Sequence, residues 1–249
     1  MCSRLENEAA VLWWRILRQN PNDLFGPEVA KLRNQTWGDR IPQPGYLGND
    51  YVPGGIMFVS MNPGGSQRDR PGTTDEQQLL ALKKLGECAR ADSLRGFANL
   101  RAVLERIMPT WSIYRNFVAP ILECAKLRFS HVVYLNLLKW RTQKDAALDR
   151  LYALSWQHHT REQFDLLRPG VVIAIGLGSG DAFKQLNSND VRLFKIRRIM
   201  NNIHPEGRAE IKRICAWLGN RAHAAQQPAA PDSGRRARGE VTGVCARCR

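Results

Sequence analysis

The sequence lacks several features that would place it in other classes of protein. It contains no apolar run that approaches the ~20 residues of a membrane-spanning helix. Its first residues mix both signs of charge, without the basic and then apolar order of a signal peptide, so we expect a cytoplasmic protein with no membrane partner. The chain also has no internal repeat, which argues against a repeat architecture.

Cysteines are few and widely scattered, at positions 2, 88, 124, 215, 245 and 248. Cys245 and Cys248 have the CxxC spacing, but neither a second such pair nor a histidine pair completes a zinc site. We therefore expect no bound metal. In a cytoplasmic chain the cysteines are expected to be reduced and to act mostly as small buried hydrophobic residues.

Acidic residues are scarce relative to basic ones, with Asp+Glu 23 against Lys+Arg 37 and a net charge of +14. An enzyme that acts on small neutral metabolites has no need of this excess. A protein that binds a polyanion does, because each neutralised phosphate releases counterions. The charge therefore favours DNA as a partner, and the alternative is a basic surface that only maintains solubility.

Apolar patterning predicts an α/β protein in which strands alternate with helices. The expected strands are 55–60, 131–135, 171–175 and 191–196, and the expected helices are 5–18, 75–91, 94–107, 113–128, 145–167, 181–187 and 207–218. Such alternation indicates a three-layer α/β/α fold around a mostly parallel four-stranded sheet. We expect one domain over 1–220 and a basic tail over 221–249, disordered from residue 222, and we read 36–54 as a surface loop.

Polar residues follow the ends of these strands. Asn62, Asn136 and the glycine turn 176–180 each follow an apolar run, and His204 stands in a late loop. The carboxyl ends of parallel strands meet at one edge of a sheet, where ligands bind. Amides beside an imidazole suit a planar ligand with mixed donors and acceptors, such as a base edge. Purely structural roles are the alternative: Asn62 would be a turn residue, Asn136 would be a helix N-cap, and His204 would be a histidine in a loop.

The order of these motifs resembles the uracil-DNA glycosylase superfamily over roughly residues 55–218. Ser60-Met61-Asn62-Pro63-Gly64 resembles that family's GxNPG turn, Asn136-Leu137-Leu138-Lys139-Trp140-Arg141 its N-x-x-K-x-R segment, and His204-Pro205 its late HP loop. The middle segment is most similar to the iron–sulphur branch, in which cysteines hold a cluster. Trp140 and Trp156 stand at those cysteine positions, so we expect the tryptophans to fill the volume by packing and no cluster to be present.

The resemblance implies a monofunctional, cofactor-free DNA glycosylase that removes uracil or another deaminated base in DNA repair. It implies that Asn62 positions the attacking water, that Asn136 reads the flipped base, and that His204 stabilises the leaving base. Met61, Gly64, Gly65 and Tyr114 would also line the substrate site, and Tyr114 or Trp111 would supply a stacking aromatic. Phosphate and duplex contacts would come from Arg68, Arg70, Lys139, Arg141 and Arg208, in a protein that acts as a monomer.

Two other functions are compatible with the sequence. The first is a protein of the same fold that binds DNA or a modified base without cleaving it, which fits the lack of an aromatic near residues 71–74. The second is an α/β enzyme that uses 176–180 as a turn for a nucleotide cofactor. No acidic residue ends a strand about twenty residues after that turn, as a dinucleotide site requires.

Overall fold

A mostly parallel, mixed sheet forms the centre of the protein. The computed structural model describes residues 4–33, 40–63, 73–143, 148–187, 191–199 and 202–226. Within these residues the sheet has five strands in the order β1-β3-β2-β4-β5. Their bounds are β1 (Tyr46–Leu47), β2 (Ile56–Ser60), β3 (Val133–Asn136), β4 (Val171–Ile175) and β5 (Arg192–Ile196). A separate hairpin pairs β6 (Arg198–Ile199) with β7 (Asn202–Ile203).

Four strands of the sheet confirm the predicted ones, and the fifth corrects the expected number. β2, β3 and β4 are buried along their whole length, because helices cover both faces of the sheet. β1 pairs antiparallel with β3 in a segment expected to be a loop. Its two residues are too few to show an alternating pattern. Gly45 precedes them with φ of +107°, and a β carbon there would overlap the carbonyl oxygen of Tyr134.

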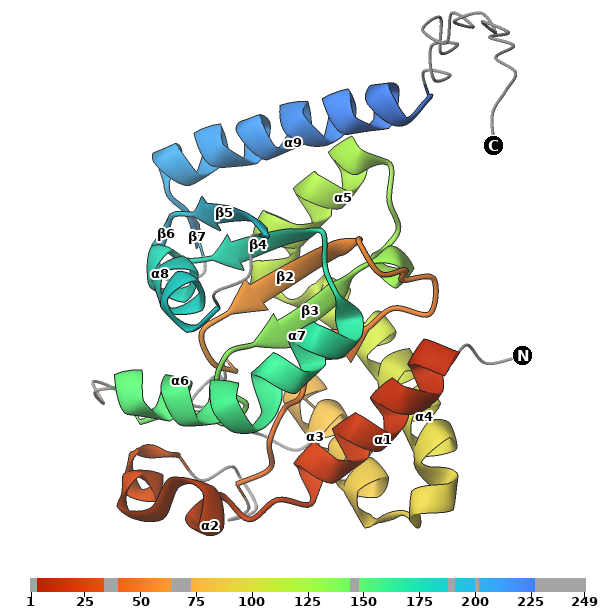
Figure 1. The fold of residues 1–249 in the computed structure, drawn as a ribbon, viewed down its shortest axis with the longest axis vertical. Helices are drawn as coiled ribbons and strands as arrows, with labels where there is room; N and C mark the ends of the chain where they lie inside the picture. Colours follow the sequence, from red (N-terminus) through yellow and green to blue (C-terminus); the bar gives the residue numbers. More distant parts are fainter. Residues whose placement is uncertain are drawn as a thin grey trace, which may run out of the picture.

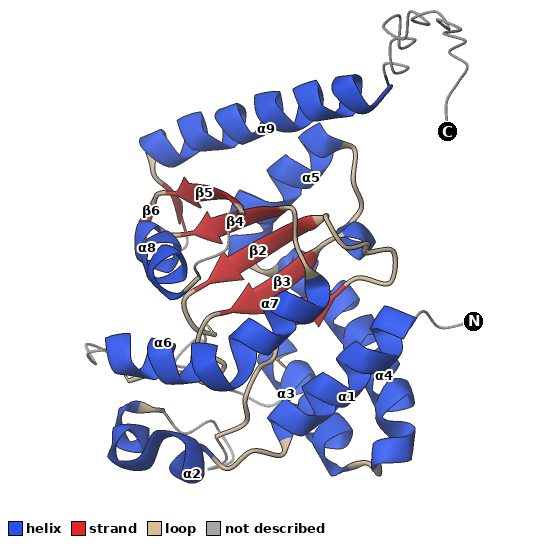
Figure 2. Ribbon diagram, viewed as in Figure 1, coloured by secondary structure: helices blue, strands red, loops and turns tan. Residues whose placement is uncertain are grey.

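Helices surround the sheet, as Figures 1 and 2 show. Their bounds are α1 (Arg4–Leu17), α2 (Pro21–Phe25), α3 (Thr74–Glu87), α4 (Ser93–Ile107), α5 (Ala119–Ala125), α6 (Asp149–Ser155), α7 (Arg161–Leu167), α8 (Leu177–Leu186) and α9 (Pro205–Gln226). Two π-helical turns, η4 (Tyr114–Val118) and η6 (Trp156–Thr160), interrupt the helices expected over 113–128 and 145–167. The long helix α9 continues past its expected end at 218. Residues 227–249, most of the expected tail, lie outside the described residues.

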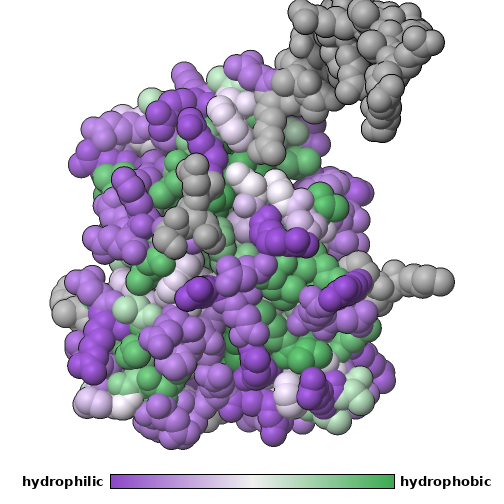
Figure 3. All heavy atoms as spheres, viewed as in Figure 1, coloured by the Kyte–Doolittle hydropathy of each residue, from purple (hydrophilic) through white to green (hydrophobic). Residues whose placement is uncertain are grey.

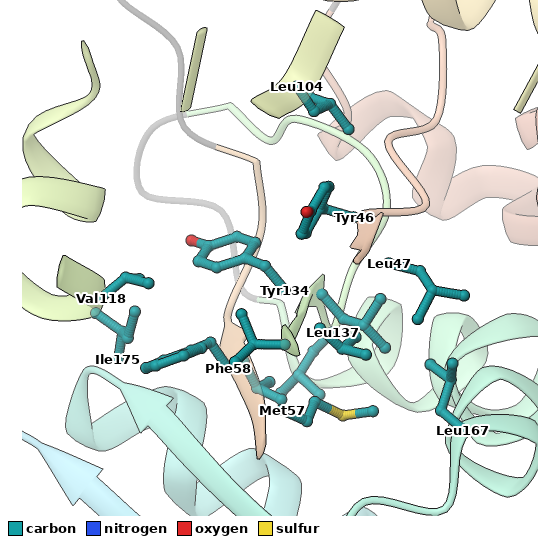
Figure 4. Packing of buried hydrophobic residues seen from close by; sticks show 14 of the residues in the cluster. Tyr46, Leu47, Met57, Phe58, Leu104, Val118, Tyr134, Leu137, Leu167 and Ile175 are labelled. Atoms are coloured by element: carbon teal, nitrogen blue, oxygen red, sulfur yellow. The ribbon is translucent and has the colours of Figure 1, made fainter. Parts of the chain in front are cut away.

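The strand register assigns side chains to the two faces of the sheet. Phe58 pairs with Tyr134 on one side and with Ile173 on the other, so these three side chains share a face. On that face Val118 of η4 lies beside Phe58 and Ile175 (Figure 4). Trp217 of α9 contacts Phe194 of β5, with 5.5 Å between the ring centres. η4 and α9 therefore cover this face, and α8 packs on β4 and β5 from the opposite one.

A disulfide corrects the expectation that the cysteines are reduced. Cys124 in α5 is bonded to Cys215 in α9, with their Cα atoms 5.6 Å apart. The two residues are separated by 91 positions in the chain. Only the packing of α5 against α9 brings them together, so their spacing in the sequence did not reveal the bond.

Most of the visible surface of the protein is polar. Figure 3 shows hydrophilic residues over most of the visible face, with smaller hydrophobic areas between them. Among the described helices, none is both long enough and apolar enough to span a membrane.

Candidate functional site

The ends of β2 and β3 bring two polar side chains to the same edge of the sheet. Ser60 and Asn136 are the last residues of these strands and lie opposite each other in the parallel register. They therefore point to the same face, the one covered by η4 and α9. Asn136 is buried, yet its side chain makes no hydrogen bond among the described residues. Within the described residues its amide therefore has unused hydrogen-bonding groups at this edge of the sheet.

Asn62 follows two residues after β2 and is held by the segment that follows β3. Its Nδ2 donates a hydrogen bond to Oγ1 of Thr142 at 3.0 Å. The backbones of the two segments are joined as well, because Leu138 N–H donates to the carbonyl of Met61 at 2.8 Å. With Nδ2 occupied, Oδ1 of Asn62 is the acceptor that can face a ligand or a water molecule.

His204 follows β7 and precedes α9, and its ring orientation is set by the helix. Its Nδ1 accepts a hydrogen bond from the backbone N–H of Glu206 at 3.2 Å. A neutral imidazole that accepts at Nδ1 carries its proton on Nε2, so Nε2 is a donor. The carboxylate of Glu206 pairs with Arg197 at 2.7 Å, and the pKa of Glu206 is lowered mainly by this hydrogen bond. The acid beside His204 is therefore already engaged.

Tyr114 begins η4, which contacts β7 just before His204. The ring is half-buried and packs edge-on against Phe129, with 5.0 Å between the ring centres. Burial raises the pKa of its hydroxyl, so the side chain is neutral at pH 7. The fold thus brings Tyr114 and His204, predicted from distant parts of the sequence, to neighbouring elements.

Met61 and the glycines of 176–180 make packing contacts at the start of α8. The helix begins at Leu177, so Gly178 and Gly180 are helical residues and not part of the expected turn. A β carbon on Gly178 would lie 3.3 Å from Sδ of Met61, and one on Gly180 would lie 2.5 Å from Cγ of Lys195. Close packing of α8 therefore accounts for both glycines, which removes the main support for a nucleotide-cofactor turn.

Lys139 and Arg141 lie inside the protein, which corrects the expectation that they contact phosphate. Lys139 is 0% exposed and its Nζ donates to the carbonyl of Asn136 at 2.6 Å. Burial lowers its pKa well below the usual value. Arg141 is 4% exposed and forms an ion pair with Asp75 at 3.3 Å. Both side chains therefore stabilise the segment that follows β3 through contacts inside the protein.

Trp140 and Trp156 are buried in aromatic surroundings. Trp140 lies edge-on to Phe25, with ring centres 5.1 Å apart, and 5.6 Å from the ring of His159. Trp156 packs edge-on against Phe183 at 5.7 Å. Both indoles are therefore packed in the core of the protein. No group of three or more candidate metal ligands occurs among the described residues.

A buried hydroxyl pair next to Asn136 was not identified from the sequence. Oγ of Ser60 and the hydroxyl of Tyr134 are 2.6 Å apart. Burial raises the pKa of Tyr134, while Ser60 and the charge of Arg198 act in the opposite direction. The sequence did contain a signal for this pair: Tyr134 stands two positions before Asn136 in the strand, so their side chains lie on the same face of the sheet.

The remaining predicted residues are placed as follows. Arg208 is exposed in the first turns of α9, and its N–H donates to the carbonyl of His204. Gly64, Gly65, Arg68 and Arg70 lie outside the described residues.

Comparison with known proteins adds no assignment: no model of a protein family and no curated protein matches this chain.

Proposed function

We propose that this chain is a monofunctional DNA glycosylase with the three-layer α/β/α fold of the uracil-DNA glycosylases. Its reaction is hydrolysis of the N-glycosidic bond of uracil or another deaminated base, after the base has been flipped out of the strand. The observation that carries the proposal is the orientation of His204. Its Nδ1 is held by the N–H of Glu206, so Nε2–H is presented as a donor.

In this proposal three side chains divide the chemistry: Asn62 and Asn136, at the ends of β2 and β3, and His204, which follows β7. Oδ1 of Asn62 accepts a hydrogen bond from the water that attacks C1′ of the sugar. As the C1′–N bond breaks, its electron pair moves onto the base, and Nε2–H of His204 stabilises the charge on a carbonyl oxygen. The Nε2–H group suits this role, because a hydrogen bond from it stabilises the developing negative charge without transfer of the proton. The water oxygen bonds to C1′ and releases a proton to bulk solvent, which leaves a hydroxyl on C1′ of the abasic site. The amide of Asn136 pairs with the edge of the base.

The residues around these three complete the proposed pocket. Tyr114 presents an aromatic ring from η4, next to the strand that leads to His204. Lys139 donates a hydrogen bond to the carbonyl of Asn136 and so orients the end of β3. Nothing in this set is a carboxylate, and Asn62 cannot remove a proton from water. We therefore expect slow turnover.

The test is formation of abasic sites in labelled oligonucleotides that carry uracil, hypoxanthine or xanthine, in single strands and in mismatched duplexes. We expect His204→Ala to reduce cleavage about 10²–10³-fold, the usual effect of removing one such donor, and Asn62→Ala to reduce it strongly. His158→Ala serves as the matched control, because His158 is exposed on η6. If the wild-type protein cleaves none of these substrates, the proposal is overturned.

The second candidate is a protein that binds DNA or a modified base without cleavage. The neutral Asn62 favours it, since an amide at this position provides no base. Retained binding of the same oligonucleotides without any abasic product would establish this alternative.

A further inference from the structure

Three exposed cations lie on α9, which begins directly after His204, and on η4, which contacts β7. Arg208 and Lys212 are on α9, and Arg115 is on η4. Within the described part of the chain, none of the three side chains forms an ion pair or a hydrogen bond. Among the described residues, no acidic side chain neutralises them.

The acidic residues of α9 do not neutralise this charge, because each is paired with a different arginine. Glu206 binds Arg197 at 2.7 Å, and Glu210 binds Arg213 at 2.7 Å. Arg208 and Lys212 alternate with these acids along the helix, and neither has an ion-pair partner in the part of the chain that the structure describes. Figure 3 shows mostly hydrophilic residues along the edge of the molecule where α9 lies.

The spacing of the cations suits a row of phosphates. Arg208 and Lys212 are four positions apart, so they share a face of the helix with ~6 Å between them along the axis. One strand of DNA rises about 3.4 Å per phosphate, so this distance corresponds to roughly two nucleotides. Arg208 is one turn from His204, and Lys212 lies one turn further from the site.

Arg115 belongs to the same region because the two helical segments run side by side. η4 contacts β7 at the end near His204, and Cys124 of α5 is bonded to Cys215 of α9 further along. η4 and α5 therefore accompany α9 away from the site. Arg115 is the second residue of η4, the segment that contacts β7.

We propose that Arg115, Arg208 and Lys212 form a phosphate-binding strip that holds the DNA strand next to the flipped nucleotide. The inference rests on the proposed function, which places the nucleotide at His204. It also replaces the phosphate contacts expected of Lys139 and Arg141, which are buried. A small anion would engage one of these cations, whereas a nucleic-acid strand engages all three. The net charge of +14 favours the same partner.

The experiment measures the salt dependence of DNA binding by the full chain. Fluorescence anisotropy of a labelled single strand of about 20 nucleotides without uracil gives log K against log[KCl] from about 50 to about 200 mM. Each of Arg115→Gln, Arg208→Gln and Lys212→Gln is expected to reduce the slope by about 0.7, and the triple variant by roughly 2. Arg213→Gln is the matched control, since it removes the same charge from α9 but its guanidinium is paired with Glu210.

The outcomes separate this inference from the proposed function. A reduced slope in the three variants, with little change in Arg213→Gln, supports the strip. Salt-dependent binding with the wild-type slope in all variants overturns the strip and leaves DNA as the partner. Equal reductions in the control and the three variants also overturn it, because they reflect total charge alone. If the wild-type protein shows no salt-dependent binding, DNA is not its partner and the proposed function fails with the strip.

Discussion

Acidification is expected to destabilise the protein through His159. This residue is 1% exposed, lies 5.6 Å from the ring of Trp140, and has no hydrogen-bond partner for Nε2 among the described residues. Burial, followed by the nearby charge of Lys139, lowers its pKa to about 3. In the unfolded chain a histidine has a pKa of about 6.5. Between these two values the unfolded state binds a proton that the native state does not.

The sign and size of the effect follow from that difference. The stability associated with neutral His159 is complete above pH 6.5 and is lost as the pH falls toward 3. One pKa unit corresponds to about 1.4 kcal/mol, so lowering the pH from 7 to 5 removes about 2 kcal/mol from the free energy of unfolding. For a protein whose total stability is roughly 5–15 kcal/mol, this change is readily measured.

Urea unfolding of wild type and His159→Gln at pH 7 and pH 5 measures this contribution. The difference in unfolding free energy between the two proteins should shrink by about 2 kcal/mol at the lower pH, because the variant has no group to titrate. The matched control is His158→Gln, which changes the exposed neighbour and should keep the pH dependence of the wild type. An equal difference between wild type and His159→Gln at both pH values would refute the reasoning.

Four further substitutions test the fold. Cys124→Ser removes the disulfide and should cost about 4–5 kcal/mol by chain entropy; reduction of the wild type should lower its Tm equally, and an unchanged Tm would contradict this. Asp75→Asn leaves Arg141 buried without its carboxylate and should cost about 3 kcal/mol in urea unfolding, whereas a neutral effect would show that other contacts hold the guanidinium. Gly207→Ala should lower the Tm, because its β carbon would overlap the backbone carbonyl oxygen of Arg197. Gly219 lies on the same helix with open space around it, so Gly219→Ala should raise the free energy of unfolding by roughly 0.5–1 kcal/mol.

The main strands could be predicted because a strand buried on both faces has a continuous run of apolar residues in the sequence. Runs such as Val171–Ile175 are continuously apolar, as buried parallel strands require. β1 has no such mark, because two residues show no pattern and its place at the edge depends on pairing with β3. The start of α8 was misread for a related reason: Gly178 and Gly180 resemble a turn, but close contact with Met61 and Lys195 requires them within a helix.

The candidate site was predictable where a residue's position along a strand determines its place in space. Asn62 and Asn136 follow two neighbouring strands, so the topology alone brings them to one edge. The surroundings of Lys139 and Arg141 were not predictable in this way. A cation three or five positions after a strand end can face solvent or turn inward, and the loop that follows β3 decides which.

The sequence by itself determined the alternation of strands and helices, the basic charge, and which polar residues end the strands, since all of these are properties of neighbouring positions. Only the tertiary structure decided contacts between distant segments. It paired Cys124 with Cys215 and buried Lys139 and Arg141 inside the protein. Those outcomes depend on how elements pack, because packing selects which side chains meet and which remain open to a ligand.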